Sequence, residues 1–97
     1  MITSFADQAT SDIFNGMESK LARKRLPMEL WKSASRKLDQ IDSVVILDEL
    51  KVPPGNRLEK LRGDRDGQMS IRINDQYRIC FTWTPTGPAQ VEIVDYH

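Results

Sequence analysis

The spacing of apolar residues changes once along this chain, at segment 52–56, and that change constrains the fold more than any other feature. Before it, apolar residues recur at helical spacing, as in helices buried on one face. After it they alternate with polar residues, as in strands that bury one face. Segment 52–56 contains two prolines and a glycine, so it is predicted to be a stiff loop. Helices followed by an antiparallel sheet indicate an α+β protein whose helices cover the apolar sheet face.

Two helices are predicted in the first half of the chain. Ser11 and Asp12 offer N-cap oxygens directly before an apolar series at helical spacing. Pro27 marks a second start, because proline suits the first helical turn. The second helix carries one apolar stripe, made of Leu30, Trp31, Ala34, Leu38 and Ile41. Segment 44–50 is compatible with a strand or a helical turn, and segment 1–5 with an edge strand or a frayed end.

The length of 97 residues predicts one domain over residues 1–97, and 39% hydrophobic residues suffice for a modest core. The single cysteine, Cys80, excludes an internal disulfide. Together with the single histidine, His97, it supplies too few soft ligands for a structural zinc site, so we expect no metal and no cofactor. No apolar run approaches the roughly 20 residues of a membrane span, and no secretory signal follows Met1. These features favour a cytoplasmic protein without a membrane partner.

The two central strands predict a cluster of positive charge on the polar face of the sheet. If residues 74–76 form the loop, apolar side chains match on one face and Arg72 lies opposite Arg78 on the other. Like charges at that spacing are destabilising unless an anion lies beside them. A carboxylate such as Glu59 or Asp95, or a bound phosphate, meets this need, because guanidinium groups bind both through paired hydrogen bonds.

Positive charge also gathers before the sheet. Between Lys20 and Lys37, seven cations accompany one anion, Glu29, although the 14 Lys and Arg of the whole chain balance 14 Asp and Glu. A segment of this kind is typical of a surface that meets nucleic acid or an acidic partner, and equally of a solvated helix face.

Three motifs in combination resemble one family of toxins. They are the segment 61–67 (Leu-Arg-Gly-Asp-Arg-Asp-Gly), the strand segment 77–79 (Tyr-Arg-Ile) and the ending 95–97 (Asp-Tyr-His). Together they resemble HigB-type toxins, also known as plasmid-maintenance killer proteins, of the RelE superfamily, and the likeness extends over the whole chain. It implies the RelE-like microbial ribonuclease fold, in which helices pack on one face of a small, twisted, mostly antiparallel sheet.

The resemblance implies the toxin of a type II toxin–antitoxin system that enters the ribosomal A site, cuts mRNA and arrests translation. It implies a HigA-type antitoxin with a helix-turn-helix domain, through which the complex binds operator DNA. Cleavage in this superfamily is metal-independent: the RNA 2′-OH attacks the adjacent phosphate and leaves a cyclic phosphate and a free 5′-OH. The alternative is a catalytically weak or inactive toxin-like module that acts mainly through antitoxin binding and operon autorepression.

Carried over residue by residue, the resemblance places Arg78 at the scissile phosphate and Arg62 beside it for phosphate binding or charge stabilisation. The last three residues match the terminal catalytic triplet of the family: Asp95, Tyr96 and His97. His97 is the expected acid or base, because histidine exchanges protons near neutral pH. Tyr96 is expected to stack on a base or to orient the 2′-OH.

Glu59 occupies a position at which some relatives carry a histidine. A carboxylate there is a candidate general base, although neighbouring cations also favour a plain salt bridge, which would weaken it as a base. The other expected RNA contacts are Arg72 on the sheet, Lys60, and Arg65 in a hairpin turn predicted at 63–67. In the basic segment, 16S ribosomal RNA is the expected partner, with the antitoxin as the alternative, for Arg23, Lys24 and Arg25.

Overall fold

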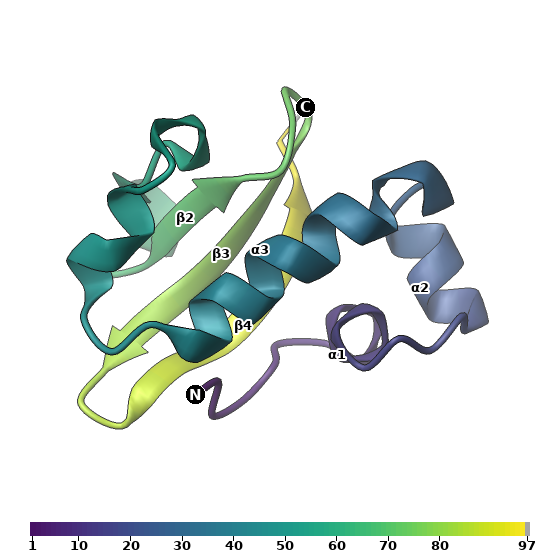
Figure 1. The fold of residues 1–97 in the computed structure, drawn as a ribbon, viewed down its shortest axis with the longest axis horizontal. Coiled ribbons are helices and arrows are strands. Elements are labelled where there is room, and N and C mark those ends of the chain that lie inside the picture. The colour runs from purple at the N-terminus through teal and green to yellow at the C-terminus, as the bar shows by residue number, and fades with distance from the viewer. Residues whose placement is uncertain (97) are drawn as a thin grey trace.

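The computed structural model describes residues 1–96 and contains a four-stranded antiparallel sheet with helices on one face (Figure 1). The strands lie side by side in chain order: β1 (Glu59–Lys60), β2 (Met69–Arg72), β3 (Tyr77–Thr84) and β4 (Gly87–Asp95). Three α-helices precede them: α1 (Gln8–Phe14), α2 (Lys20–Arg25) and α3 (Trp31–Ser43). The predicted α+β class and the order of helices before sheet are confirmed. No helix within residues 1–96 is long and apolar enough to cross a membrane.

The β2–β3 hairpin has the register that the sequence predicts. Ile71 pairs with Ile79, and Arg72 lies opposite Arg78. The side-chain oxygen of Asn74 accepts hydrogen bonds from two backbone N–H groups of the loop, at 2.9 and 2.8 Å. This loop geometry fixes the register, which in turn decides which side chains face the helices and which face away.

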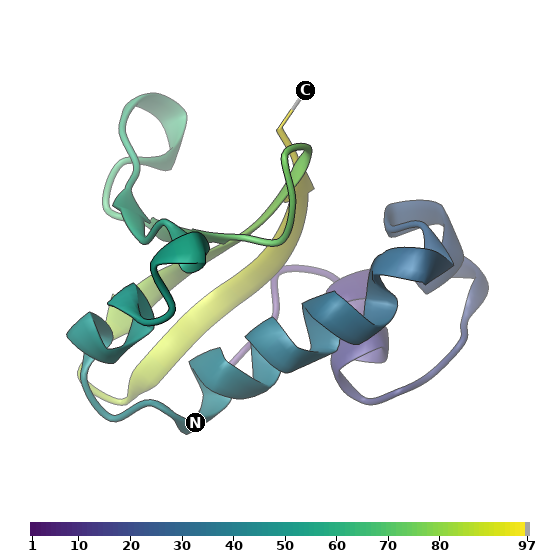
Figure 2. The ribbon, with the colours of Figure 1, turned by 45° about the horizontal axis from the view of Figure 1, so that its top comes forward.

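The core lies between α3 and the sheet, and Figure 2 shows α3 running along one side of the twisted strands. Its largest fully buried apolar side chains include Leu38, Ile41, Ile71, Ile79, Phe81 and Val91. Burying one such side chain contributes about 1.5–3 kcal/mol, so this layer is the main source of stability. The apolar stripe predicted for the second helix therefore faces the sheet, and Trp31 at its start donates from Nε1 to the Leu26 carbonyl at 2.8 Å.

The start of the first helix differs from the prediction. The N-cap is Asp7, whose carboxylate accepts from the backbone N–H of Thr10 at 2.7 Å, and the predicted caps Ser11 and Asp12 lie inside α1. The apolar series alone placed the cap too late, because the first turn of α1 carries little of that series. The hydroxyl of Thr10 is itself buried and accepts from the Ile93 N–H at 3.0 Å, which ties this turn to β4.

The single helix predicted before Pro27 is two helices. Gly16, at a φ of 73°, follows α1 in a left-handed conformation that a glycine adopts without strain. Ser19 then caps α2 by accepting from the Ala22 N–H at 3.0 Å. The Ser19 hydroxyl also donates to the buried Asp12 carboxylate at 2.6 Å, so the residue predicted as a cap instead joins the two helices.

The connection from α3 to the sheet contains the stiff loop that the sequence predicts. The undecided segment 44–50 forms a 3₁₀ turn at Leu47–Lys51, and a second turn follows at Pro54–Asn56. At the other end of the chain, Phe5 forms a parallel bridge with Val91, so segment 1–5 lies along the edge of β4.

Asn56 fastens this loop to α3. Its side chain is fully buried, and its amide nitrogen donates to Gln40 Oε1 at 3.0 Å and to the Leu50 carbonyl at 3.1 Å. A longer contact of 3.4 Å reaches the Val52 carbonyl. The amide oxygen accepts from the Lys37 ammonium group. One side chain thus joins α3, the turn Leu47–Lys51 and the loop that follows it.

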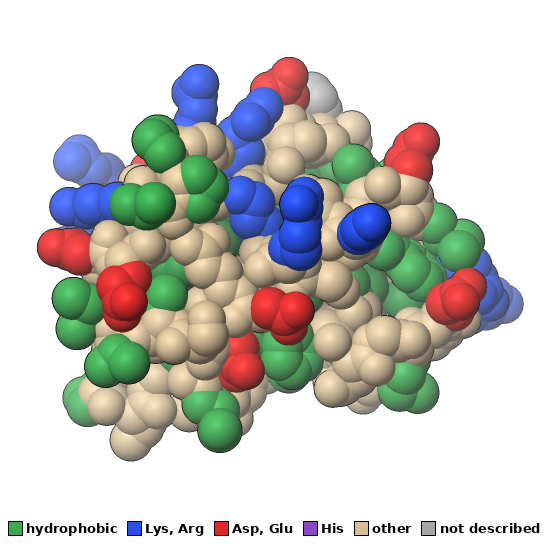
Figure 3. Space-filling view, viewed as in Figure 1, with side chains coloured by type: hydrophobic (Ala, Val, Ile, Leu, Met, Phe, Trp, Pro, Cys, Tyr) green, Lys and Arg blue, Asp and Glu red, His purple; other side chains and the backbone are tan. Residues whose placement is uncertain are grey.

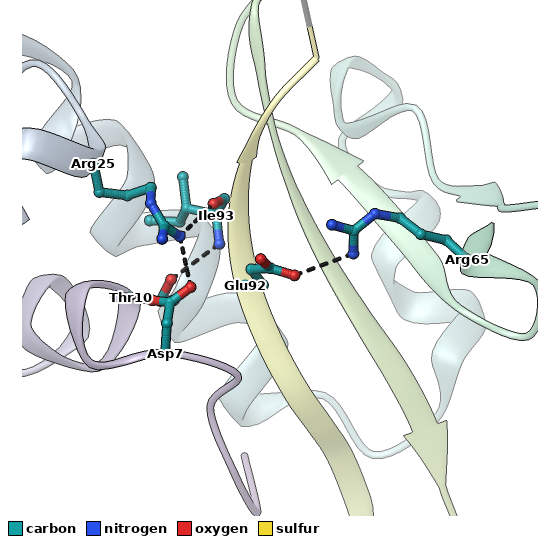
Figure 4. A network of polar contacts seen from close by, with 6 residues as sticks. All are labelled: Asp7, Thr10, Arg25, Arg65, Glu92 and Ile93. Atoms are coloured by element: carbon teal, nitrogen blue, oxygen red, sulfur yellow. Dashed lines mark hydrogen bonds and ion pairs between the residues drawn. The ribbon is translucent and has the colours of Figure 1, made fainter.

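Replacing Asp7 by asparagine is expected to lower the free energy of unfolding by about 0.5–1 kcal/mol at pH 7, because asparagine keeps an N-cap oxygen but loses the charge that pairs with Arg25. The carboxylate caps α1 and pairs with Arg25 at 2.6 Å, and Arg25 also donates to the Ile93 carbonyl at 2.9 Å (Figure 4). Burial raises the pKa of Asp7, but hydrogen bonds from Thr10 and Arg25 outweigh it and hold this pKa below 3.8. The stabilisation is therefore complete above about pH 5 and is lost as the pH falls through the lowered pKa.

Urea unfolding at pH 7 and at pH 2.5 measures this contribution. The difference between wild type and Asp7→Asn is expected to be greatest at pH 7 and to shrink toward pH 2.5, as the carboxylate becomes protonated. Asp39→Asn, on an exposed turn of α3, serves as the control. A loss at pH 7 no larger for Asp7→Asn than for Asp39→Asn would contradict the assignment.

Candidate functional site

A row of polar side chains crosses all four strands on the face away from the helices. The strand pairing places Glu59 opposite Ser70, Ser70 opposite Cys80 and Cys80 opposite Glu92. These positions alternate with the core residues of the same strands, so they point to the opposite face. Ser70 and Cys80, at the centre of the row, are fully buried. Other side chains must therefore cover this face.

Arg78 lies beside this row and is held by neutral acceptors. Its Nε donates to Ser70 Oγ at 2.8 Å, and its Nη2 donates to the Arg57 carbonyl at 2.7 Å and to the Ser70 carbonyl at 3.4 Å. Its Nη1 makes no hydrogen bond with residues 1–96, and no carboxylate in that range forms an ion pair with it. A half-buried guanidinium with fixed orientation and unused donors is suited to bind an anion.

The anion beside Arg72 is a carboxylate from the hairpin loop. Arg72 pairs with Asp75, three residues further along the chain, so the expected carboxylate lies beside Arg72 but comes from a residue other than the examples Glu59 and Asp95. The side chain of Asp75 is 97% exposed, and solvent therefore weakens this pair. The two arginines that face each other across the hairpin thus have different partners, a carboxylate for Arg72 and neutral oxygens for Arg78.

A second arginine reaches the polar face from the loop between β1 and β2. Arg65 lies 3.1 Å from the Glu92 carboxylate on β4 and 3.0 Å from Gln68 Oε1. Figure 4 shows Arg65 and Glu92 pointing toward each other on one side of β4, with Asp7 and Arg25 on the other. The predicted hairpin turn is confirmed, since the Leu61 N–H donates to the Gln68 carbonyl at 2.8 Å across its base. The side chain of Arg65 does not point away from this turn into solvent. It extends over the sheet to Glu92 on β4.

Tyr96 lies among these groups. The Arg78 guanidinium carbon is 5.8 Å from the centre of the Tyr96 ring, which is cation–π geometry. Burial and the charges of Cys80 and Glu59 raise the pKa of Tyr96 above 10.0, while Arg78 and Arg65 oppose them. The phenol is therefore protonated at neutral pH and available to donate a hydrogen bond. The charges of both arginines and of Glu59 therefore act on this phenol, and Arg78 is the one in ring contact.

Cys80 is a packing residue at the bottom of this site. Burial raises the pKa of its thiol above 9.0, and the charges of Arg65 and Arg78 only partly offset that effect. A protonated thiol without solvent access is neither a nucleophile nor a metal ligand.

Within residues 1–96, no group of three His, Cys, Asp or Glu side chains is arranged to hold a metal ion, and no pocket is enclosed. The site is an open polar surface.

The other predicted catalytic and phosphate-binding residues have different surroundings. Arg62 is exposed and forms no hydrogen bond or ion pair with the described residues, and Lys60 is exposed on β1. Asp95, at the end of β4, accepts from Gln76 Nε2 at 3.1 Å. His97 lies outside the described residues. The structure therefore gathers Arg78, Arg65 and Tyr96 but gives no contact that brings Arg62 to them.

The three cations predicted to contact ribosomal RNA lie on α2, away from the polar face. Arg25 is engaged in the fold through Asp7 and Ile93. Arg23 donates to the Glu18 carbonyl at 2.6 Å, and Lys24 is exposed. Only Arg23 and Lys24 of this group therefore present their charge mainly to solvent.

Two contacts of the site were missed by sequence reasoning. Glu92 emerges only from the β3–β4 register, in which it lies opposite Cys80. The carbonyl of Arg57 approaches Arg78 because this residue adopts a left-handed conformation, at a φ of 47°, after the turn Pro54–Asn56. Glu92 alternates with buried apolar residues along β4, and this pattern could have placed it on the polar face. No local pattern indicates the conformation of residue 57.

Comparisons with known proteins agree with this architecture. The family described as RelE-like toxin of type II toxin-antitoxin system HigB matches residues 3–97. Toxin HigB-1 of Vibrio cholerae serotype O1 is 38% identical over 66 residues, which cover 68% of this chain and 70% of that protein. An uncharacterised protein of Haemophilus influenzae is 37% identical over 59 residues, covering 61% and 58%.

The fold is also present among solved structures. A chain of the YoeB–YefM complex from Staphylococcus aureus superimposes with a TM-score of 0.60 at 20% identity, covering 100% of this chain and 95% of that chain. At this identity the similarity concerns the fold alone. It confirms the predicted RelE-like arrangement of helices on one face of an antiparallel sheet.

Proposed function

Because this chain belongs to the HigB-like family of RelE-like toxins of type II toxin–antitoxin systems, we propose that it is a ribosome-dependent endoribonuclease that cleaves mRNA on its polar sheet face. The observation that carries this proposal is the setting of Arg78. Neutral oxygens hold its guanidinium in place, and Nη1 keeps donors that no described residue uses. A scissile phosphate is an anion of the right shape for such a group.

The proposed reaction transfers the phosphate within the RNA. The 2′-oxygen attacks the adjacent phosphorus, the bond from phosphorus to the 5′-oxygen breaks, and the products are a 2′,3′-cyclic phosphate and a free 5′-OH. Arg78 stabilises the negative charge that grows on the phosphoryl oxygens in the transition state. Arg62 adds phosphate binding from the loop edge, and no metal takes part.

The two proton transfers are assigned to residues around Tyr96. Glu59 is the proposed base for the 2′-OH, since it lies in the polar row and its charge acts on the Tyr96 phenol. His97 is the proposed acid that protonates the 5′-oxygen, with Asp95 two residues before it in the chain. Tyr96 orients the 2′-OH or stacks on a base, and its protonated hydroxyl fits the first role.

The proposed partners follow from the same family. A HigA-type antitoxin with a helix-turn-helix domain would bind the toxin and carry the complex to operator DNA. On the ribosome, Arg23 and Lys24 of α2 are proposed to contact 16S ribosomal RNA, with the antitoxin as their alternative partner. The cytoplasm, where ribosomes translate mRNA, is therefore the proposed location of the protein.

Purified protein added to a reconstituted translation reaction tests the proposal. New mRNA 5′ ends carrying a hydroxyl are expected when ribosomes translate the message, and none when the same mRNA is incubated without ribosomes. Ends formed without ribosomes would contradict ribosome dependence. Arrested translation with intact mRNA would contradict the nuclease, and intact mRNA with normal translation but tight antitoxin binding would favour a non-catalytic binding module.

A further inference from the structure

Lys37 of α3 has two cations within electrostatic reach, Arg36 beside it on α3 and Arg72 at the end of β2. Lys37 of α3 is half-buried and donates to the buried Asn56 side chain. Burial lowers the pKa of Lys37, and the charges of Arg36 and Arg72 lower it further. Among these three, only Arg72 has an ion pair with a described carboxylate, the exposed Asp75. Like charges held together in this way oppose folding, so the cluster is suited to an external anion.

Two consecutive residues, Asn56 and Arg57, connect this cluster to the polar face. The Arg57 carbonyl accepts from Arg78 on the polar face, and the preceding residue, Asn56, accepts from Lys37 on the helix side. The chain can pass here because β1 is short and pairs only with Met69 and Ser70. The edge of β2 beyond Ser70 is therefore not covered by a strand, and Arg57, whose side chain is exposed, directly follows Asn56 at this edge.

Figure 3 views the molecule from the α3 side and shows Lys and Arg side chains gathered across the middle and upper part of this face, with Asp and Glu side chains mostly around them. Positive charge thus gathers on the face that α3 occupies, and the contacts of Arg57 and Asn56 link this face to Arg78. A chain of phosphates that follows the surface would meet one cation after another along this path.

We propose that Arg57, Arg72, Lys37 and Arg36 form a basic band that binds the phosphodiester backbone of single-stranded RNA next to the scissile phosphate. The inference rests on the proposed function, because Arg78 defines where the RNA enters the band. An RNA strand is favoured over an acidic protein because the band continues directly from the proposed cleavage face. Its role is binding and alignment of the substrate strand, and it takes no part in proton transfer.

Fluorescence anisotropy with labelled, fully 2′-O-methylated RNA tests the band, because this RNA lacks the attacking hydroxyl and is not cleaved. Oligonucleotides of two and eight nucleotides are titrated with the full-length protein at several salt concentrations. The longer RNA is expected to bind more tightly to wild type. Arg36→Gln is expected to weaken binding of the longer RNA about three- to tenfold and to make the slope of log K against log salt shallower by about 0.7, the loss of one phosphate contact.

Arg57→Gln is a second variant with the same expected effect, and both leave Lys37 and its bond to Asn56 intact. Lys51→Gln is the matched control, since Lys51 is an exposed cation outside the band that pairs with Asp48 at 3.6 Å. The dinucleotide is expected to bind equally to all variants, because it is too short to reach the band.

The band is refuted if Arg36→Gln and Arg57→Gln bind the longer RNA as tightly as Lys51→Gln does. It is also refuted if both variants keep RNA binding but lose affinity for the cognate antitoxin, which would make this surface a protein interface. Length-dependent binding that is lost in both variants supports the band even if the protein cleaves no mRNA. In that case the proposed nuclease function fails separately.

Discussion

An Arg78→Ala variant is expected to cleave mRNA about a hundred- to a thousandfold more slowly than wild type, and its expression should no longer arrest growth. The alanine removes the guanidinium whose unused donors are proposed to bind the phosphoryl oxygens in the transition state. The rate of appearance of new mRNA 5′ ends in translating extracts measures the effect. The growth rate of cells that express each variant without antitoxin is an independent measurement of toxicity.

Two further variants separate charge from geometry. Arg78→Lys keeps the positive charge but loses the planar fork, and it is expected to recover only part of the activity. Lys51 is exposed and lies outside the proposed site, so Lys51→Ala should cleave mRNA at the wild-type rate. Because Arg78 also bonds to Ser70 and to the Arg57 carbonyl, urea unfolding must show that the variants are folded. Equal growth arrest from wild type and a folded Arg78→Ala, without new 5′ ends, would defeat the nuclease proposal.

Asn56→Ala is expected to lower the free energy of unfolding by about 3 kcal/mol, a large part of the stability of a small domain. The change leaves the Leu50 carbonyl and the Gln40 side chain without a donor and opens a gap in a fully buried place. It also removes the acceptor of the half-buried Lys37 ammonium group. The whole loop from α3 to β1 then loses its main attachment.

Urea unfolding at pH 7 measures this loss, and Asn15→Ala provides the control. Asn15 is exposed after α1 and makes one long side-chain bond, 3.3 Å to Ser11, so its replacement is expected to cost less than about 0.5 kcal/mol. Similar midpoints for the two variants would show that the bonds of Asn56 are replaced by water and that the loop is held in another way.

The sheet could be predicted in detail because its residues constrain each other. Alternating apolar residues on β2 and β3 match in one register only, and that register alone places Arg72 opposite Arg78. Helix ends were harder to predict. Asp7 caps α1 before the apolar series begins, and Gly16 divides a pattern that continues at helical spacing on both sides. Periodicity reports the face that a helix buries and carries little information on where it begins.

The site was predicted in part for the same reason. Arg78 and Tyr96 lie together as the motifs suggest, because strand alternation and the end of β4 fix both. The pairing of Arg65 with Glu92 depends on a loop folding back across the sheet, which no spacing along the chain encodes. The carboxylate beside Arg72 was missed because it comes from the hairpin loop, where Asp75 is only three residues away.

The ion pair between Arg65 and Glu92 joins the loop after the first strand to the last strand of the sheet. This crosslink spans the surface from one side to the other, and it holds the loop down before any ligand arrives. The donors and acceptors of that surface are thus preorganised, so little conformational entropy remains to be lost on association. In the proposed reaction, the RNA strand would therefore make more of the conformational adjustment than this loop does.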